Sequence, residues 1–458
     1  MSMRRVLSTV SMAALIGAGM AVAAALPANA QEVKVVNIWH TESNSKTKAA
    51  IAEIMADFEK LNPGVKLRQE GVSWGSLSAK LTAALAAGAP PDMSHGQTYI
   101  ERSLSAKGLL RPLNDVYASI GEDDILDVVK KLDYNTEDGN YYGIAHAIGT
   151  DVLIYRKDFY EEAGVSEDVP KTWADWIETL KKLTVDLDGD GLPDRYGLDL
   201  AGPGFFINEE VYMWVGSNGG TLFGPNGRPT FDTKPVHEML AFYKELNDCC
   251  LPPGWLGHGY RDNFVALATG KVASILGWGR GAYTFEKLAP DLVEAGAFGV
   301  MPGKPIGPSG TTFLTQLDSE PWMIFKDAKY PEIAAEFLKF FYQKDNYRKY
   351  IQTVPVHFFP ITKSLREDAA YQATPDFETW GFWTDAQQNI IANHEPKPLM
   401  MTEWDDLSLP FTKEIADSGI LIDMVVAVVS GQSTPEEAAA RAQRRAEDLI
   451  TQLGYKTW

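Results

Sequence analysis

The sequence predicts an α/β protein in which a parallel sheet carries helices on its faces. Two observations lead to this fold class. Apolar runs of strand type occur twice near the start of the chain, and each is followed by apolar residues at helical spacing. Such β-α-β-α alternation is typical of sheets whose ligands bind beyond the carboxyl ends of the strands.

The first elements follow one another in order. Residues 33–39 predict a buried strand, and residues 51–61 predict a helix that Pro63-Gly64 ends. Residues 65–69 predict a second strand, and residues 77–85 predict a second helix before Gly88.

Three later helices have clear start signals. Thr172 with Asp175 predicts a capping box that opens a helix to residue 183. Pro331 opens an apolar helical stripe, and Thr434-Pro435 begins a helix that Gly454 follows.

Composition and the first residues indicate an exported protein. The 458 residues carry a formal net charge of -19, which argues against nucleic acid or an anionic membrane surface as partner. Arg4 and Arg5, an apolar stretch over residues 12–26 and Ala28-Asn29-Ala30 predict a signal peptide over residues 1–30, cleaved after Ala30. We therefore expect a monomer in the periplasm, without a membrane anchor.

The only two cysteines, Cys249 and Cys250, are neighbours. A bridge between neighbours closes a strained ring, so a reduced buried pair is at least as compatible with the sequence as a disulfide.

Several motifs occur in an order that resembles family 1 extracellular solute-binding proteins, the sugar-binding subunits of bacterial ABC importers. They are Trp39 at a strand end and residues 58–65, 87–92, 108–113, 142–144, 155–158, 170–173, 270–273 and 332–340. The resemblance implies a type II periplasmic binding protein fold with two lobes around a cleft. Ligand closes the lobes by a hinge motion, and the permease subunits of the importer recognise the closed form.

The resemblance also implies how the chain divides between the lobes. The N-terminal lobe would hold residues 31–148 and 320–364, and the C-terminal lobe residues 149–319 and 365–458. Crossings between the lobes would lie near Gly149, Ser319 and Ser364.

Polar ligand contacts are implied after three strands, although side chains at strand ends also cap helices. The expected contacts are His40, Thr41, Glu42, Gly96, Gln97, Tyr99, Thr150 and Asp151, with His357 later in the chain.

Aromatic side chains would stack on the apolar face of a sugar, although each could instead belong to the core. The candidates are Trp74, Phe205, Phe206, Trp278 and Trp404. Gly279 and Arg280, which are also expected contacts, follow Trp278 in a turn that resembles the family's Gly-Pro-Trp turn without its proline. Arg280 would hold the acidic group of an acidic sugar, or would pair with one of the protein's own carboxylates.

A run of acidic residues has the spacing of a calcium loop. The expected ligands are Asp186, Asp188, Asp190, Leu192 and Asp194, with glycine at the sixth position. The twelfth position is Gly197 and supplies no carboxylate, so a solvated Asp-Gly turn is the alternative. A bound calcium ion would be structural.

The sequence contains no H-E-x-x-H motif and no P-loop, and the seven histidines include no pair at i, i+4 for zinc. The sequence therefore predicts a binding protein for a sugar or oligosaccharide that is not an enzyme. A secreted glycoside hydrolase is the alternative, because two carboxylates would suffice for that chemistry.

Overall fold

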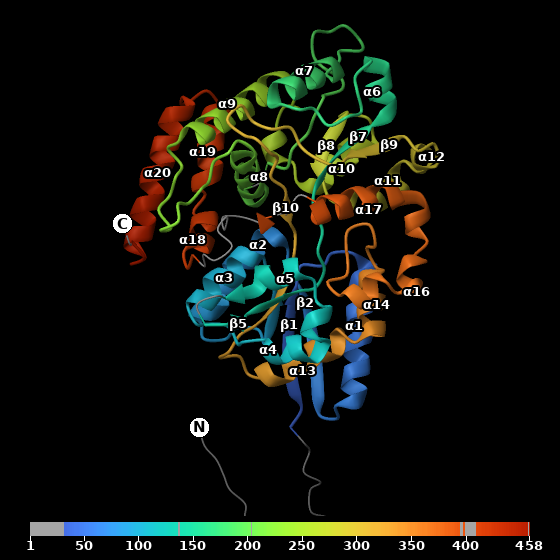
Figure 1. The fold of residues 1–458 in the computed structure, drawn as a ribbon, viewed down its shortest axis with the longest axis vertical. Coiled ribbons are helices and arrows are strands. Elements are labelled where there is room, and N and C mark those ends of the chain that lie inside the picture. The colour runs from blue at the N-terminus through green and yellow to red at the C-terminus, as the bar shows by residue number, and fades with distance from the viewer. Residues whose placement is uncertain (1–31, 136–137, 203, 394–396, 399–408, 457) are drawn as a thin grey trace, which may run out of the picture.

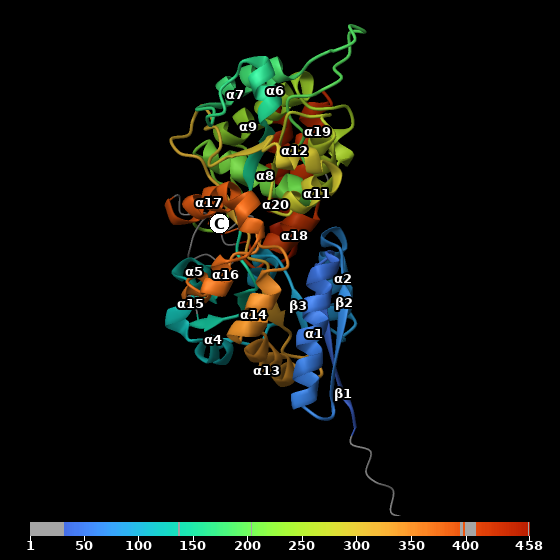
Figure 2. The ribbon, with the colours of Figure 1, turned by 90° about the vertical axis from the view of Figure 1, so that its right-hand side faces the viewer.

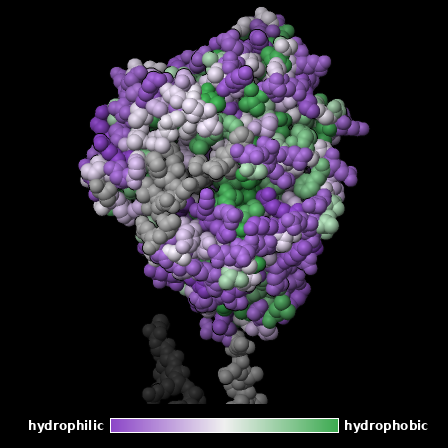
Figure 3. All heavy atoms as spheres, in the orientation of Figure 1, coloured by the Kyte–Doolittle hydropathy of each residue, from purple (hydrophilic) through white to green (hydrophobic). Residues whose placement is uncertain are grey.

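The computed structural model describes residues 32–135, 138–202, 204–393, 397–398, 409–456 and 458. The chain forms two lobes, one above the other in Figure 1, and Figure 2 shows the same division from the side. The face in Figure 3 is mainly hydrophilic and has an apolar area at mid-height, where the two lobes meet.

The lower lobe in Figure 1 contains a five-stranded sheet of order β2-β1-β3-β11-β6. Strand β1 pairs in parallel with β2 and β3, whereas β11 is antiparallel to β3 and β6. Val36 and Ile38 of β1 are fully buried among the apolar faces of the covering helices. The strands are β1 (Lys34–His40), β2 (Val65–Gly71), β3 (Met93–His95), β6 (Gly143–Ala145) and β11 (Pro321–Ile324).

The helices of this lobe include the three that the sequence predicts over residues 51–61, over residues 77–85 and from Pro331 onward. They are α1 (Ser45–Leu61), α2 (Trp74–Ala86), α3 (Thr98–Ala106), α4 (Asn114–Ile120), α5 (Asp127–Asp133), α13 (Pro331–Phe341), α14 (Lys344–Ile351), α15 (Lys363–Arg366) and α16 (Ala369–Gln372), with the short pair β4 (Tyr134–Asn135) and β5 (Asn140–Tyr141) and the 3-10 turn η1 (Glu122–Asp124).

The upper lobe contains a three-stranded sheet of order β8-β7-β9 in which all pairs are antiparallel. The expectation of a parallel sheet is therefore wrong for this lobe and for β11. The reason is the connectivity, because β7 and β11 each enter directly from the other lobe and run against their neighbours, whereas β8 and β9 follow helices of their own lobe. The strands are β7 (Val152–Arg156), β8 (Ser274–Gly277) and β9 (Phe298–Met301).

Helix α8 (Gly204–Ser217) runs through the core of this lobe, and nearly all of its residues from Ile207 onward are buried. The capping box at Thr172 opens α7 as predicted. The other elements are α6 (Lys157–Ala163), α7 (Trp173–Leu183), α9 (Lys234–Cys249), α10 (Tyr260–Ala268), α11 (Gly281–Leu288), α12 (Pro290–Glu294), α17 (Asp376–Asn393), α18 (Thr412–Asp417), α19 (Ile420–Val429), α20 (Pro435–Gln452), the 3-10 turn η2 (Trp255–Gly257) and the pair β10 (Gln316–Leu317) and β12 (Lys397–Pro398).

The chain passes between the lobes at three places. The first two passages run side by side, because Gly149 and Asp318 exchange backbone hydrogen bonds of 3.0 and 2.9 Å. The third lies beyond the expected Ser364, whose side chain bonds Asp124 within the lower lobe. Tyr371 and Phe377 still pack in the lower core, whereas Trp380 packs in the upper core.

Helix α18 is an exception to the expected assignment of residues 365–458 to one lobe. It packs against α3 of the lower lobe, where Ser103 donates a hydrogen bond to the carbonyl of Pro410. Thr412 also donates to the carbonyl of Tyr99. The C-terminal segment therefore contacts both lobes.

Cys249 and Cys250 form a disulfide at the C-terminus of α9. The reduced pair that the sequence allowed is thus not the state in this structure. Among the described residues, no helix has both the length and the apolar character that crossing a membrane requires.

Candidate functional site

A pocket of about 480 Å³ lies between the two lobes. Its lining comes from strand ends, from the N-termini of α2, α8 and α10, and from the passages between the lobes. The lining residues are Thr41, Ser43, Trp74, Gln97, Phe205, Phe206, Glu209, Tyr260, Trp278, Arg280, Asp318, Glu320 and His357.

One wall of the pocket is aromatic and includes side chains of both lobes. Trp74 of the lower lobe stacks on Phe205 of the upper lobe, with ring centroids 5.8 Å apart and planes 13° apart. Phe206 lies 5.6 Å from Tyr260 and 6.3 Å from Trp278. Such faces can stack on the C–H groups of a sugar ring.

The floor of the pocket contains an ion pair between the lobes. Arg280, which follows β8, donates from both terminal nitrogens to Glu42, which follows β1, at 3.2 and 3.3 Å. Burial is the largest single influence and opposes the charge of Glu42, but Arg280 together with His146 and His40 lowers the pKa of this carboxyl from its usual value. Of the two roles expected for Arg280, the structure therefore shows the pair with the protein's own carboxylate.

Glu320 stands beside this pair in an uncommon backbone conformation. Its φ of 40° is the only positive value for a non-glycine residue in the described part of the chain. Glu320 Oε2 lies 2.7 Å from His146 Nε2 and 3.8 Å from Arg280 Nη2. Backbone strain of this kind is concentrated at functional sites, where surrounding contacts maintain it.

Several buried polar atoms of the lining have no hydrogen-bond partner among the residues that the structure describes. They are Gln97 Oε1, Glu209 Oε2, Asp318 Oδ1, His357 Nδ1 and Trp278 Nε1. Burial raises the pKa of Glu209 and of Asp318 well above the usual value for a carboxyl, and neighbouring carboxylates add to the effect. A ligand that supplies partners to these atoms would remove an energetic cost.

A second buried ion pair lies behind the pocket, near the first two passages. Lys304 Nζ is 2.7 Å from Asp151 and also donates to Thr315. Thr315 and Thr150 share a hydrogen bond of 2.8 Å. These groups satisfy one another and do not line the pocket.

Eight of the expected ligand residues do line the pocket. They are Thr41, Trp74, Gln97, Phe205, Phe206, Trp278, Arg280 and His357, and Glu42 contributes through its pair with Arg280. Trp404 lies outside the described residues.

Six other residues that were expected to contact ligand do not line the pocket. His40 bonds Gln69, Tyr99 lies in the core, and Thr150 and Asp151 belong to the Lys304 pair. Gly96 and Gly279 serve close packing instead, since an added Cβ would meet Met323 and the carbonyl of Val356 respectively. Strand ends thus supply packing groups as well as ligand contacts.

Five lining residues were not predicted from the sequence, namely Ser43, Glu209, Tyr260, Asp318 and Glu320. Tyr260 follows a Gly-x-Gly turn at a helix start, and Asp318 and Glu320 flank the expected crossing at Ser319. Those signals were present, but they do not reveal which way a side chain points.

The acidic loop brings together some of the expected calcium ligands. Carboxylate oxygens of Asp186, Asp188 and Asp194 lie within 4.8 Å of one another, and Asp190 is not in this group. Backbone N–H groups already donate to Asp186 and Asp194. Three clustered carboxylates on an exposed loop have the chemistry that calcium prefers.

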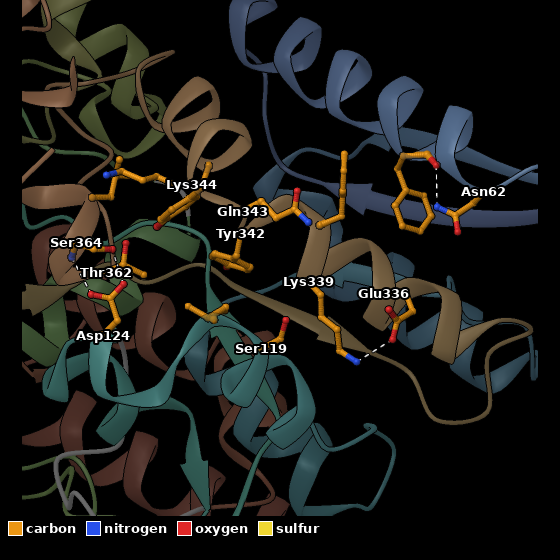
Figure 4. Close-up of a pocket in the computed structure, with 15 residues that line it drawn as sticks. Asn62, Ser119, Asp124, Glu336, Lys339, Tyr342, Gln343, Lys344, Thr362 and Ser364 are labelled. Carbon is orange, nitrogen blue, oxygen red and sulfur yellow. Dashed lines mark hydrogen bonds and ion pairs between the residues drawn. The ribbon is translucent and has the colours of Figure 1, made fainter. Parts of the chain in front are cut away.

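Figure 4 shows a wider pocket on the lower lobe, of about 1230 Å³. Its charged side chains have partners, because Lys339 Nζ lies 2.8 Å from Glu336 and Asp124 accepts a hydrogen bond from Ser364. Lys344 pairs with Asp368 at 2.7 Å. The pocket between the lobes, with its buried unpartnered atoms, is therefore the candidate binding site.

Comparison with known proteins identifies the family of the chain. Residues 41–348 match the family described as bacterial extracellular solute-binding protein. A putative ABC transporter periplasmic-binding protein of Escherichia coli is 22% identical over 91% of this chain and 93% of its own. The mannitol-binding protein of Pseudomonas aeruginosa is 22% identical over 94% of this chain and 96% of its own.

Solved structures share the fold. An ABC transporter solute-binding protein from Thermotoga lettingae, bound with α-D-tagatose, has a TM-score of 0.73 at 19% identity, over 91% of this chain and 100% of its own. A maltose/maltodextrin-binding domain from Bdellovibrio bacteriovorus, bound to maltotriose, has a TM-score of 0.71 at 22% identity, over 91% and 100%. The two-lobed fold implied by the sequence resemblance is thereby confirmed.

Proposed function

The chain belongs to the bacterial extracellular solute-binding proteins, and from that membership we propose that it captures a carbohydrate between its lobes and delivers it to the permease of an ABC importer. The observation that supports this proposal most directly is that both lobes contribute residues to one pocket. Trp74 and Glu42 come from one lobe, whereas Phe205 and Arg280 come from the other.

This arrangement couples ligand binding to closure. The Trp74–Phe205 stack and the Arg280–Glu42 pair form only when the lobes meet, so a ligand that fills the space between them favours the closed form. Small-angle scattering should show a smaller radius of gyration when ligand saturates the protein. An unchanged radius would contradict a hinge binder.

A thermal-shift screen against sugars and polyols tests the carbohydrate proposal. A ligand at 100 times its dissociation constant adds about 2.7 kcal/mol to the free energy of unfolding. Hits are then measured by isothermal titration. If no sugar or polyol raises the melting temperature, the proposed function is wrong.

We further propose that the protein binds its ligand without altering it, as a transport protein and not a glycoside hydrolase. Chromatography of oligosaccharides after long incubation should return them unchanged. Shortened products would support the hydrolase alternative.

The export of the chain and its calcium site are also proposals. Cleavage after Ala30 would release a monomeric protein into the periplasm, which N-terminal sequencing and light scattering of the secreted protein would test. A calcium ion held by Asp186, Asp188 and Asp194 would stabilise the loop by neutralising carboxylates that repel one another.

A further inference from the structure

This inference rests on the proposed function and specifies its ligand. We propose that the pocket between the lobes selects a sugar or polyol that carries a protonated amine, such as an amino sugar, because four carboxyl groups but a single guanidinium lie in or directly beside its described lining. The four are Glu42, Glu209, Asp318 and Glu320, and the guanidinium belongs to Arg280.

The guanidinium is not free to bind an acidic ligand. Both of its terminal nitrogens already donate to Glu42, and Glu320 lies 3.8 Å from one of them. Lys304 is paired with Asp151 and does not line the pocket. A carboxylate ligand would therefore have to displace Glu42 and approach three further carboxyl groups.

Three of the five unpartnered atoms of the lining call for hydrogen-bond donors, whereas Trp278 Nε1 donates and His357 Nδ1 donates or accepts, which suits the hydroxyl groups of a sugar. Gln97 Oε1 can only accept, and Glu209 Oε2 and Asp318 Oδ1 accept when their carboxyl groups are ionised. An ammonium group offers three donors and a positive charge, whereas a hydroxyl offers one donor. A buried carboxylate is tolerated when it is paired with such a charge.

The protonation of the Glu209 and Asp318 carboxyl groups makes charged and neutral ligands distinguishable. In the closed protein without ligand, burial raises the pKa of both Glu209 and Asp318 well above the usual range. The titratable groups that face them are Glu42, Asp151, Glu210, Arg280, Glu320 and His357. An ammonium favours the ionised carboxylates, so its binding should release protons near neutral pH.

The aromatic wall is compatible with both parts of such a ligand. The faces of Trp74 and Trp278 can stack on sugar C–H groups, and aromatic faces also attract cations.

Isothermal titration with matched ligands tests the proposal. The panel contains glucosamine, galactosamine and mannosamine, their N-acetyl forms, the parent hexoses and glucuronate. At least one amine should bind tenfold or more tightly than its N-acetyl form and its parent hexose. Titration in two buffers of different ionisation enthalpy should show proton release for that amine, and its affinity should rise from pH 5 to pH 7.

Each other outcome contradicts the proposal in a recognisable way. If a neutral sugar or glucuronate binds as tightly as every amine, the charge selectivity is wrong while the proposed carbohydrate function stands. If no sugar of this panel or of the wider thermal-shift screen binds, both proposals fail.

Two isosteric variants assign the selectivity to the pocket. Asp318→Asn and Glu209→Gln should each reduce the ratio of amine to N-acetyl affinity by tenfold or more and should reduce proton release. Glu336→Gln, in the pocket of Figure 4, is the matched control and should change neither. Melting curves establish that all three are folded. An unchanged ratio and unchanged proton release in both pocket variants would overturn the proposal.

Discussion

Two buried ion pairs lie beside the pocket, and they connect different parts of the molecule. Lys304 and Asp151 both belong to the upper lobe and its adjoining passages, and their side chains are 1% and 4% exposed. Arg280 and Glu42 come from opposite lobes. The first pair exists whenever the protein is folded, whereas the second requires the lobes to meet. Similar chemistry therefore serves folding in one place and closure in the other.

The largest effect is expected for Lys304→Met. This variant leaves Asp151 buried and unpaired, which should lower the free energy of unfolding by about 3 to 5 kcal/mol. Urea denaturation of the ligand-free protein measures it. The double variant Lys304→Met with Asp151→Leu should recover part of the loss, because no buried charge remains. If the single variant is as stable as the wild type, the pair is not closed off from water.

Glu42→Gln should affect binding more than folding. Losing the carboxylate weakens the contact between the lobes and removes a negative charge from the pocket, so affinity should fall by at least about 2 kcal/mol. The free energy of unfolding without ligand should change by less than about 1 kcal/mol, since open lobes leave both groups in water. An equal loss in both measurements would mean that the lobes stay together without ligand.

Gly279→Ala tests how Arg280 is positioned. An added Cβ would stand 1.9 Å from the carbonyl oxygen of Val356, so the turn must shift. Overpacking of this kind costs about 1 to 3 kcal/mol. We expect both the melting temperature and the ligand affinity to fall, as measured by calorimetry. A loss of stability with unchanged affinity would show that Arg280 does not depend on this turn.

Calcium removal should have the smallest effect on stability and should leave both ion pairs unchanged. Calcium at ten times its dissociation constant would add about 1.4 kcal/mol to the free energy of unfolding. Chelation should therefore lower the melting temperature and leave ligand affinity unchanged. Metal analysis that finds no calcium, together with an unchanged melting temperature, would identify the loop as an ordinary turn.

The sequence allowed good prediction where local pattern decides the structure. Strand β1, helix α1 and the capping box at Thr172 follow from periodicity and end signals, and the structure confirms them. Trp278 and Arg280 were placed at the pocket through the family resemblance.

Contacts between residues far apart in the chain could not be predicted from the sequence. Nothing local indicates that Glu42 would meet Arg280, that Glu209 would face the pocket from the start of α8, or that α18 would return to α3. Each depends on how separate parts of the chain dock, and docking leaves no periodic signal in the sequence.

The position of β11 has a consequence for the time course of folding. This strand fills the gap between β3 and β6, so the sheet of the lower lobe cannot be completed before residue 324 has been synthesised. At about 5 to 20 residues per second, that point comes roughly 16 to 65 seconds after synthesis begins. Until then β3 and β6 have open edges, and pairing across so long a loop is slow. The sheet of the lower lobe is thus incomplete for most of the chain's synthesis.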